Sequence, residues 1–140
     1  MASNQSVLQG MILAAARETH EELKQGYNEV HYQNLLLAKL KAIGLKAHKE
    51  VAFTMYSQEG HMLGTSRADI VVERLSIVDV EGEDVVQVEE GFIIEVKAGV
   101  KPCPKHYEQL LRYTRHYPMA FNGSLIYFGL HEVKFRWSGV

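Results

Sequence analysis

Apolar positions follow a helical period in three stretches of the chain. Apolar residues recur every three to four positions over about residues 6–24 and 28–43. Gly26 and Gly44 follow these two stretches, and glycine readily adopts the left-handed conformation that ends a helix. A third stretch covers Pro104 to about His116, and proline is well suited to the first turn of a helix. The pattern therefore predicts three helices.

Extended segments occupy the rest of the chain. Residues 50–56, the stretch from Met62, residues 68–80 and residues 85–97 are rich in β-branched and aromatic side chains and are divided by turn signals such as Glu59-Gly60. Two more strands are predicted at 124–130 and 132–137. The expected order is α, α, β, β, β, β, α, β, β. Without a linker or repeat, residues 1–140 are predicted to form one α/β (α+β) domain.

Composition narrows the class of protein. The chain has 140 residues, of which 46% are hydrophobic and 23% charged, and its net charge is −2. These values are typical of a globular domain and argue against disorder, a coiled coil or a histone-like binder. The single cysteine, Cys103, forms no intrachain disulfide. Because no segment approaches the roughly 20 apolar residues of a membrane helix, we expect a soluble, intracellular protein without a membrane partner.

Glu95-Val96-Lys97 combines an acid and a base near the end of a predicted strand. Side chains alternate along a strand, so Glu95 and Lys97 should share a face. The carboxylate can hold a hard cation such as Mg²⁺, and the ammonium can orient a water molecule and stabilise developing negative charge. A solvent-facing ion pair is the alternative for an isolated motif of this kind.

Asp69 stands at the start of another apolar run, Ile70-Val71-Val72. A buried acid in such a place is costly without a cation or a hydrogen-bond donor. On adjacent strands, Asp69 and Glu95 can supply two ligands to one metal ion. The alternative is an ordinary strand-end acid beside Arg67.

The helix predicted after Lys97 is basic. Gln109 and Tyr113 lie four positions apart and share a face, with His106 within about 60° of both. The apolar stripe assigned to the core is Tyr107, Leu110, Leu111 and Thr114. Cations suited to a phosphate backbone are Lys101, Lys105, Arg112 and Arg115. The alternative is a polar face that only contacts solvent.

Taken together, these motifs resemble those of a nuclease superfamily. Asp69 followed by Glu95-Val96-Lys97 resembles the PD-(D/E)XK signature, and residues 26–32, Gly-Tyr-Asn-Glu-Val-His-Tyr, match the G-x-x-E-x-x-Y pattern of its GxxExxY family. The resemblance covers roughly residues 12–129. Two departures are Ala68 in place of the proline before the first acid and a longer segment between the two acids.

The resemblance implies a PD-(D/E)XK restriction-endonuclease-like core of order αβββαβ with an additional C-terminal strand. It implies that Mg²⁺, with Mn²⁺ as a substitute, is bound by Asp69, Glu95, the carbonyl of Val96 and Glu29. Lys97 would be catalytic, together with these acids. Glu29 is expected off the Leu36/Leu40 face, where the helix dipole also favours an acid. Glu50 is expected either to face the metal cleft or to pair with Lys49 or a neighbouring lysine.

The helix motif Gln109-x-x-x-Tyr113 resembles that of RecB-like exonucleases in the superfamily. It implies that His106, Gln109 and Tyr113 position the substrate strand, with Lys101, Lys105 and Arg112 on its phosphates. The expected function is Mg²⁺-dependent hydrolysis of phosphodiester bonds, in DNA in preference to RNA. The alternatives are a catalytically silent binding or scaffold protein and a dimeric Holliday-junction-resolvase-like endonuclease. Serine or cysteine nucleophile motifs and Gly-rich phosphate loops are absent, which argues against an acyl hydrolase or a nucleoside triphosphatase.

The segment between the two acids is unusually acidic. Residues 73–95 contain eight acids and one base, a net charge of −7. Residues 76–90 are predicted to form a lengthened hairpin that closes at Glu81–Asp84. Such a hairpin should avoid nucleic acid. We expect it to bind a basic protein partner or a second copy of the chain, or to remain a solvated hairpin.

Overall fold

The computed structural model describes residues 6–138. Within them the elements are α1 (Val7–Leu23), α2 (Glu29–Ala42), β1 (Lys46–Tyr56), β2 (Met62–Val80), β3 (Glu83–Ala98), α3 (Pro104–His116), β4 (Asn122–Phe128) and β5 (Val133–Trp137). The three predicted helices and the α+β class are confirmed. The predicted number of strands is wrong by one, because the strand from Met62 continues without a break into residues 68–80. Pairing with β1 holds residues 63–67 extended, although Gly64-Thr65-Ser66 interrupts the local pattern.

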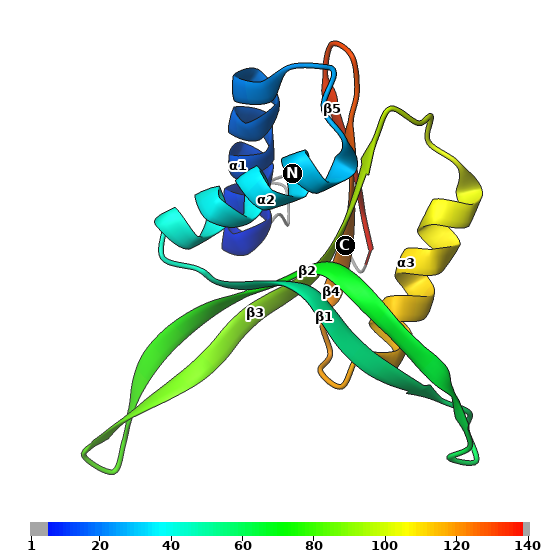
Figure 1. Cartoon of the computed structure of the whole chain (residues 1–140). Helices are drawn as coiled ribbons and strands as arrows, with labels where there is room; N and C mark the ends of the chain where they lie inside the picture. Colours follow the sequence, from blue (N-terminus) through cyan, green and yellow to red (C-terminus); the bar gives the residue numbers. More distant parts are fainter. Residues whose placement is uncertain (1–5, 139–140) are drawn as a thin grey trace, which may run out of the picture.

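The strands form one sheet in the order β1-β2-β3-β4-β5. Neighbouring strands are antiparallel except β3 and β4, which run parallel and are joined through α3 (Figure 1). Parallel neighbours require such a crossover connection, because a short turn only joins antiparallel strands. The carboxyl ends of β3 and β4 consequently lie side by side.

Helices cover both faces of the sheet (Figure 1). On one face α1 and α2 enclose a core that includes Ile12, Leu36 and Val96. On the other face α3 packs through Leu110 on a second core that includes Ile93. Alternate residues of a strand face opposite sides, so β3 contributes to both cores. No helix among residues 6–138 is long and apolar enough to span a membrane.

Strand β2 has neighbours on both sides only from Ile70 to Glu73. Residues before this segment pair only with β1, and residues after it pair only with β3. The sheet therefore splits into two ribbons that diverge, as seen at the lower left and lower right of Figure 1. The ribbon of residues 75–90, which we call the acidic arm, contains the acidic hairpin predicted at residues 76–90. Its end is the turn between Val80 and Glu83.

Candidate active site

The point where β2 and β3 separate holds the two predicted acids. Backbone pairing between these strands ends at Ile70 and Ile94. Immediately beyond, the backbone N–H of Asp69 donates to Oε2 of Glu95 at 2.8 Å, and the N–H of Val96 donates to Oδ2 of Asp69 at 2.8 Å. The two side-chain carboxyls thus accept backbone N–H groups that strand pairing no longer binds at this point. This exchange places both acids at one fork between strands.

Burial and mutual repulsion govern the charge of this pair. Glu95 is only 3% exposed. Desolvation, followed by the charge of Asp69, raises the pKa of Glu95 to about 8. Desolvation also raises the pKa of Asp69, with smaller effects of the same sign from Glu50 and Glu29. Full ionisation of both carboxyls is therefore unfavourable here without a counter-charge.

Lys97 follows Glu95 by two positions on β3 and is partly buried. It therefore lies on the same face of the strand. Its positive charge lowers the pKa of both acids, although less than burial raises them. On the parallel neighbour β4 the residue in register with Lys97 is Tyr127. An ammonium thus lies close to the carboxyl pair without neutralising it.

Glu29 reaches this end of the sheet from the first turn of α2. Its Oε1 accepts the backbone N–H of Ala98 at 3.2 Å. The expectation that Glu29 lies off the Leu36/Leu40 face is wrong, because residues 29, 33, 36 and 40 follow the stripe that faces the sheet. The start of α2 is set by Asn28, whose N–H donates to Nδ1 of His31 at 3.1 Å. Capping of α2 therefore also positions Glu29.

Gln33 is a residue of this site that the sequence motifs did not indicate. It lies one turn after Glu29, and its side-chain Nε2 donates to the backbone carbonyl of Asp69 at 2.9 Å. Gln33 is 6% exposed, so this polar group is buried in the face of α2 that packs on the sheet. The one signal in the sequence is the spacing of four from Glu29, which puts both side chains on one helix face.

Glu50 lies on β1 opposite Asp69. The pairs Lys49–Ile70 and Val51–Ala68 enclose this position. Glu50 has a φ of 55°, which is uncommon for a residue other than glycine. Lys49 donates to Oδ1 of Asn34 at 3.0 Å, so the expected pairing of Glu50 with Lys49 is not found. Glu50 instead lies near enough to Asp69 to raise its pKa.

Helix α3 lies on the same face of the sheet as Glu95 and Lys97. Gln109 donates to the hydroxyl of Tyr113 at 3.0 Å, and Nδ1 of His106 is 2.8 Å from the hydroxyl of Tyr127. Tyr113 is buried against Phe53, with ring centroids 5.3 Å apart, and so belongs to the core. The assignment of Leu111 to the core is wrong, because it is 37% exposed.

The predicted phosphate-binding cations remain on the surface. Lys101, Lys105 and Arg112 are exposed. Among the described residues, none of them forms an ion pair with Asp69 or Glu95. They are therefore free of the carboxyl pair and open to solvent around α3.

The donor set at the fork suits a hard divalent cation. Asp69 and Glu95 each have a second carboxylate oxygen that the two backbone bonds do not use. Oxygen ligands with excess negative charge are what Mg²⁺ requires, and this ion keeps several waters in its shell. Within residues 6–138, no group of three His, Cys, Asp or Glu side chains is gathered closely enough to hold a metal. Glu29 thus lies beside the Asp69–Glu95 pair, not within it.

Comparison with known proteins agrees with this geometry. The family model described as the PD-(D/E)XK nuclease superfamily matches residues 6–138. The chain belongs to this superfamily. The match extends over both helical layers and the whole sheet, including the fork that holds Asp69 and Glu95. Membership of the narrower GxxExxY family stays a prediction.

The crystal structure of a protein designated SSO0001 is similar to this chain. The identity is 17%, the TM-score is 0.48, and the match covers 97% of this chain and 79% of the other. A comparison with curated proteins gave no match.

Proposed function

We propose that this protein is a metal-dependent nuclease that hydrolyses phosphodiester bonds in DNA, in preference to RNA. The observation that carries the proposal is the contact between Asp69 and Glu95 at the fork of β2 and β3, with Lys97 on the same strand. Membership of the nuclease superfamily supports nucleic acid as the substrate. Nucleases of this superfamily typically use divalent metal ions.

Asp69, Glu95 and the carbonyl of Val96 would hold Mg²⁺, or Mn²⁺ in its place, with Glu29 assisting from α2. When bound, such an ion lowers the pKa of an attacking water and neutralises charge on the phosphate. The raised pKa of Glu95, about 8, favours this assignment, because a bound cation would offset the repulsion between the two carboxyls. Gln33 would keep Asp69 in place through its carbonyl.

Lys97 would act on the substrate side of the carboxyl pair. Its ammonium can hold the attacking water or stabilise the negative charge that develops on the phosphate. Gln109 would position the strand, and its bond to Tyr113 would fix its orientation. His106 would also position the strand, and its hydrogen bond with the hydroxyl of Tyr127 would fix its orientation. The exposed cations Lys101, Lys105 and Arg112 would bind backbone phosphates of the substrate.

The acidic arm favours a protein partner as a second role. Its strands pair only with each other, so both outer edges carry backbone groups without a strand neighbour. Ile77 and Val86 are directly opposite on one face and are 69% and 62% exposed. Exposed edges and apolar faces invite pairing. We propose that the arm contacts a second copy of the chain or a basic protein, as in a dimeric resolvase or a nuclease-fold scaffold.

A cleavage panel tests the proposed activity. The purified protein is incubated with single-stranded, double-stranded and branched DNA and with RNA, in Mg²⁺, in Mn²⁺ and in EDTA. Cleavage that needs the metal and is lost in Asp69→Asn would support the nuclease. Paired nicks in branched DNA would favour a resolvase. Well-folded protein that neither cleaves nor binds these metals would instead favour the scaffold.

A further inference from the structure

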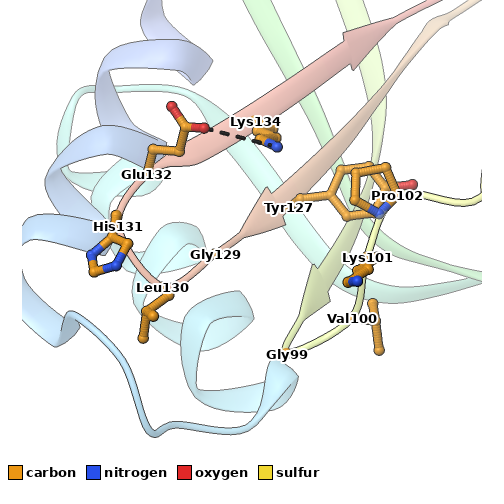
Figure 2. A pocket seen from close by; sticks show the side chains of 10 residues that line it. All are labelled: Gly99, Val100, Lys101, Pro102, Tyr127, Gly129, Leu130, His131, Glu132 and Lys134. Atoms are coloured by element: carbon orange, nitrogen blue, oxygen red, sulfur yellow. Dashed lines mark ion pairs between the residues drawn. The ribbon is translucent and has the colours of Figure 1, made fainter.

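A cavity lies beyond the carboxyl ends of the parallel strands β3 and β4. These strands end at Ala98 and Phe128, which are in register. The chain leaves β3 towards α3, whereas it leaves β4 in a tight turn in which Gly129 N–H donates to the carbonyl of Glu132. The two exits separate around a cavity of about 440 Å³ (Figure 2). The crevice beyond the carboxyl ends of strands is a common ligand site in open α/β sheets.

The walls of this cavity combine apolar side chains with positive charge. Val100 and Leu130 are 50% and 60% exposed, and Pro102 adds further apolar surface. The basic residues of the lining are Lys101, Lys134 and His131. In Figure 2, Leu130 and His131 lie at one end, and Pro102, Lys101 and Tyr127 lie at the other. A ligand with an apolar part and an anionic part suits such walls.

Lys134 is available to such a ligand. Its only ion pair among the described residues is with Glu132, at 3.8 Å, and both side chains are exposed. Exposed pairs of this kind contribute little free energy, because water screens them. An incoming phosphate can therefore displace Glu132 at small cost.

The cavity adjoins the face that carries the candidate catalytic residues. Tyr127 lines it and is in register with Lys97 on the neighbouring strand. A second cavity of about 300 Å³ shares Tyr127, Pro102 and Lys134 with the first. It extends to the start of α3, where the Arg136 guanidinium lies 3.7 Å from the centroid of the Tyr107 ring. The two cavities thus meet at Tyr127, the β4 residue that is in register with Lys97.

We propose that this cavity binds one unpaired nucleotide of a nucleic-acid strand, next to the bond that is cut. Its place in the reaction rests on the proposed nuclease function. Leu130 and Pro102 contact the base, while Lys101 and Lys134 contact its phosphate. A cavity of several hundred Å³ has the usual size of a small-ligand site. A base that is still paired brings its complementary strand with it, so the site selects single-stranded or frayed substrates.

Binding measured in EDTA separates this site from catalysis. A fluorescein-labelled single-stranded deoxy-oligonucleotide is titrated with the full chain, and its anisotropy is followed. Loss of the apolar contact that buries a leucine side chain against the base lowers single-strand affinity about tenfold or more. We expect this loss in Leu130→Glu and in the double variant Lys101→Ala/Lys134→Ala. Lys41→Ala removes an exposed lysine at the far end of α2 and should bind as the wild type does.

A second titration identifies the ligand. Deoxyadenosine monophosphate should shift the amide NMR signals of residues 99–101 and 129–134, and inorganic phosphate should shift them less. Equal shifts with both ligands would mean an anion site only and would overturn the proposal. So would unchanged single-strand affinity in Leu130→Glu, whose folding is checked by its melting temperature.

These experiments distinguish failure of the nuclease proposal from failure of the cavity proposal. Wild-type protein that binds nucleotide in this cavity but does not cleave in Mg²⁺ or Mn²⁺ would refute the nuclease and support the cavity. Wild-type protein that cleaves, with Leu130→Glu equally active and equally tight, would refute the cavity and leave the nuclease standing.

Discussion

Gln33 and Asp69 are joined by a partly buried hydrogen bond of 2.9 Å, in which the side chain of Gln33 on α2 donates to the backbone carbonyl of Asp69 on β2. The bond exists because β2 leaves β3 at this residue, so the carbonyl of Asp69 has no partner there in the β2–β3 ladder. A buried carbonyl without a partner costs about 1–3 kcal/mol. Gln33 therefore stabilises the one backbone position that carries the first acid of the site.

Gln33→Leu should weaken metal binding without removing a ligand. The expected loss of affinity for Mn²⁺ is about 10- to 100-fold, which is usual when a group that orients a metal ligand is removed. Isothermal titration calorimetry measures it. Asn34→Leu is the matched control, because Asn34 is exposed on the same helix and binds Lys49 instead. Equal Mn²⁺ affinity in the two variants would contradict a positioning role for Gln33.

Glu95 should make the metal-free protein less stable as pH rises. Its pKa is about 8 in the folded protein, against 4.5 for an ordinary glutamate. Between these values the folded protein keeps a proton that the unfolded chain has lost, so the free energy of unfolding falls with increasing pH. The contribution of Glu95 to the free energy of unfolding is thus fully present below about pH 4.5 and is lost as the pH rises through about 8.

Thermal unfolding in EDTA between pH 5 and 9 measures this effect. Glu95→Gln should show a flatter dependence of melting temperature on pH and should melt higher than the wild type at pH 9. Glu108→Gln, an exposed position on α3, is the control and should follow the wild type. Parallel curves for wild type and Glu95→Gln would show that Glu95 is not protonated in the folded protein.

Lys97→Ala should abolish cleavage while the fold and metal binding persist. Removing one group that stabilises developing charge typically lowers the rate about 100- to 1,000-fold. Lys97 is only partly buried and makes no ion pair among the described residues, so its loss should leave the melting temperature within a few degrees. Single-turnover cleavage and Mn²⁺ titration are compared with Lys41→Ala. A folded Lys97→Ala protein with full activity would reject the catalytic role.

Shortening the acidic arm should leave the active site intact and convert an oligomer to a monomer. Ser76 and Gln87 are paired, so replacing residues 77–86 with Asn-Gly joins them by a two-residue turn. In this design Arg74 and Glu90 keep their 3.2 Å contact, and the backbone N–H of Leu8 in α1 still donates to the Glu90 carboxylate. Light scattering should show an oligomer for the wild type and a monomer for the variant.

Two results would contradict the prediction that the acidic arm forms an oligomer and is separate from the active site. A wild type that is already monomeric would reject self-association and leave a basic protein as the proposed partner of the arm. Loss of Mn²⁺ binding in the shortened protein would mean that the arm supports the active site. The fork at Ile70 and Ile94 lies beyond the removed residues, and so we expect Mn²⁺ affinity to be unchanged.

Local periodicity was enough to predict the helices and the shared face of Glu95 and Lys97. Helices α1, α2 and α3 begin and end within about two residues of the expected positions. The reason is that a helix is set by nearby residues, such as Gly26 and Pro104. The alternation of side chains on β3 follows in the same way, because its period of two is a property of any strand.

Tertiary structure alone decided how the site is assembled. Asp69 and Glu95 are 26 positions apart, and their contact exists because the pairing of β2 with β3 ends at this point, where β2 pairs with β1 alone. The direction of Glu29 and the bond from Gln33 depend on the packing of α2 against that fork. The burial that raises the pKa of Glu95 likewise exists only in the folded sheet with its covering helices. The length over which each pair of strands stays together is a long-range property, which no local pattern specifies.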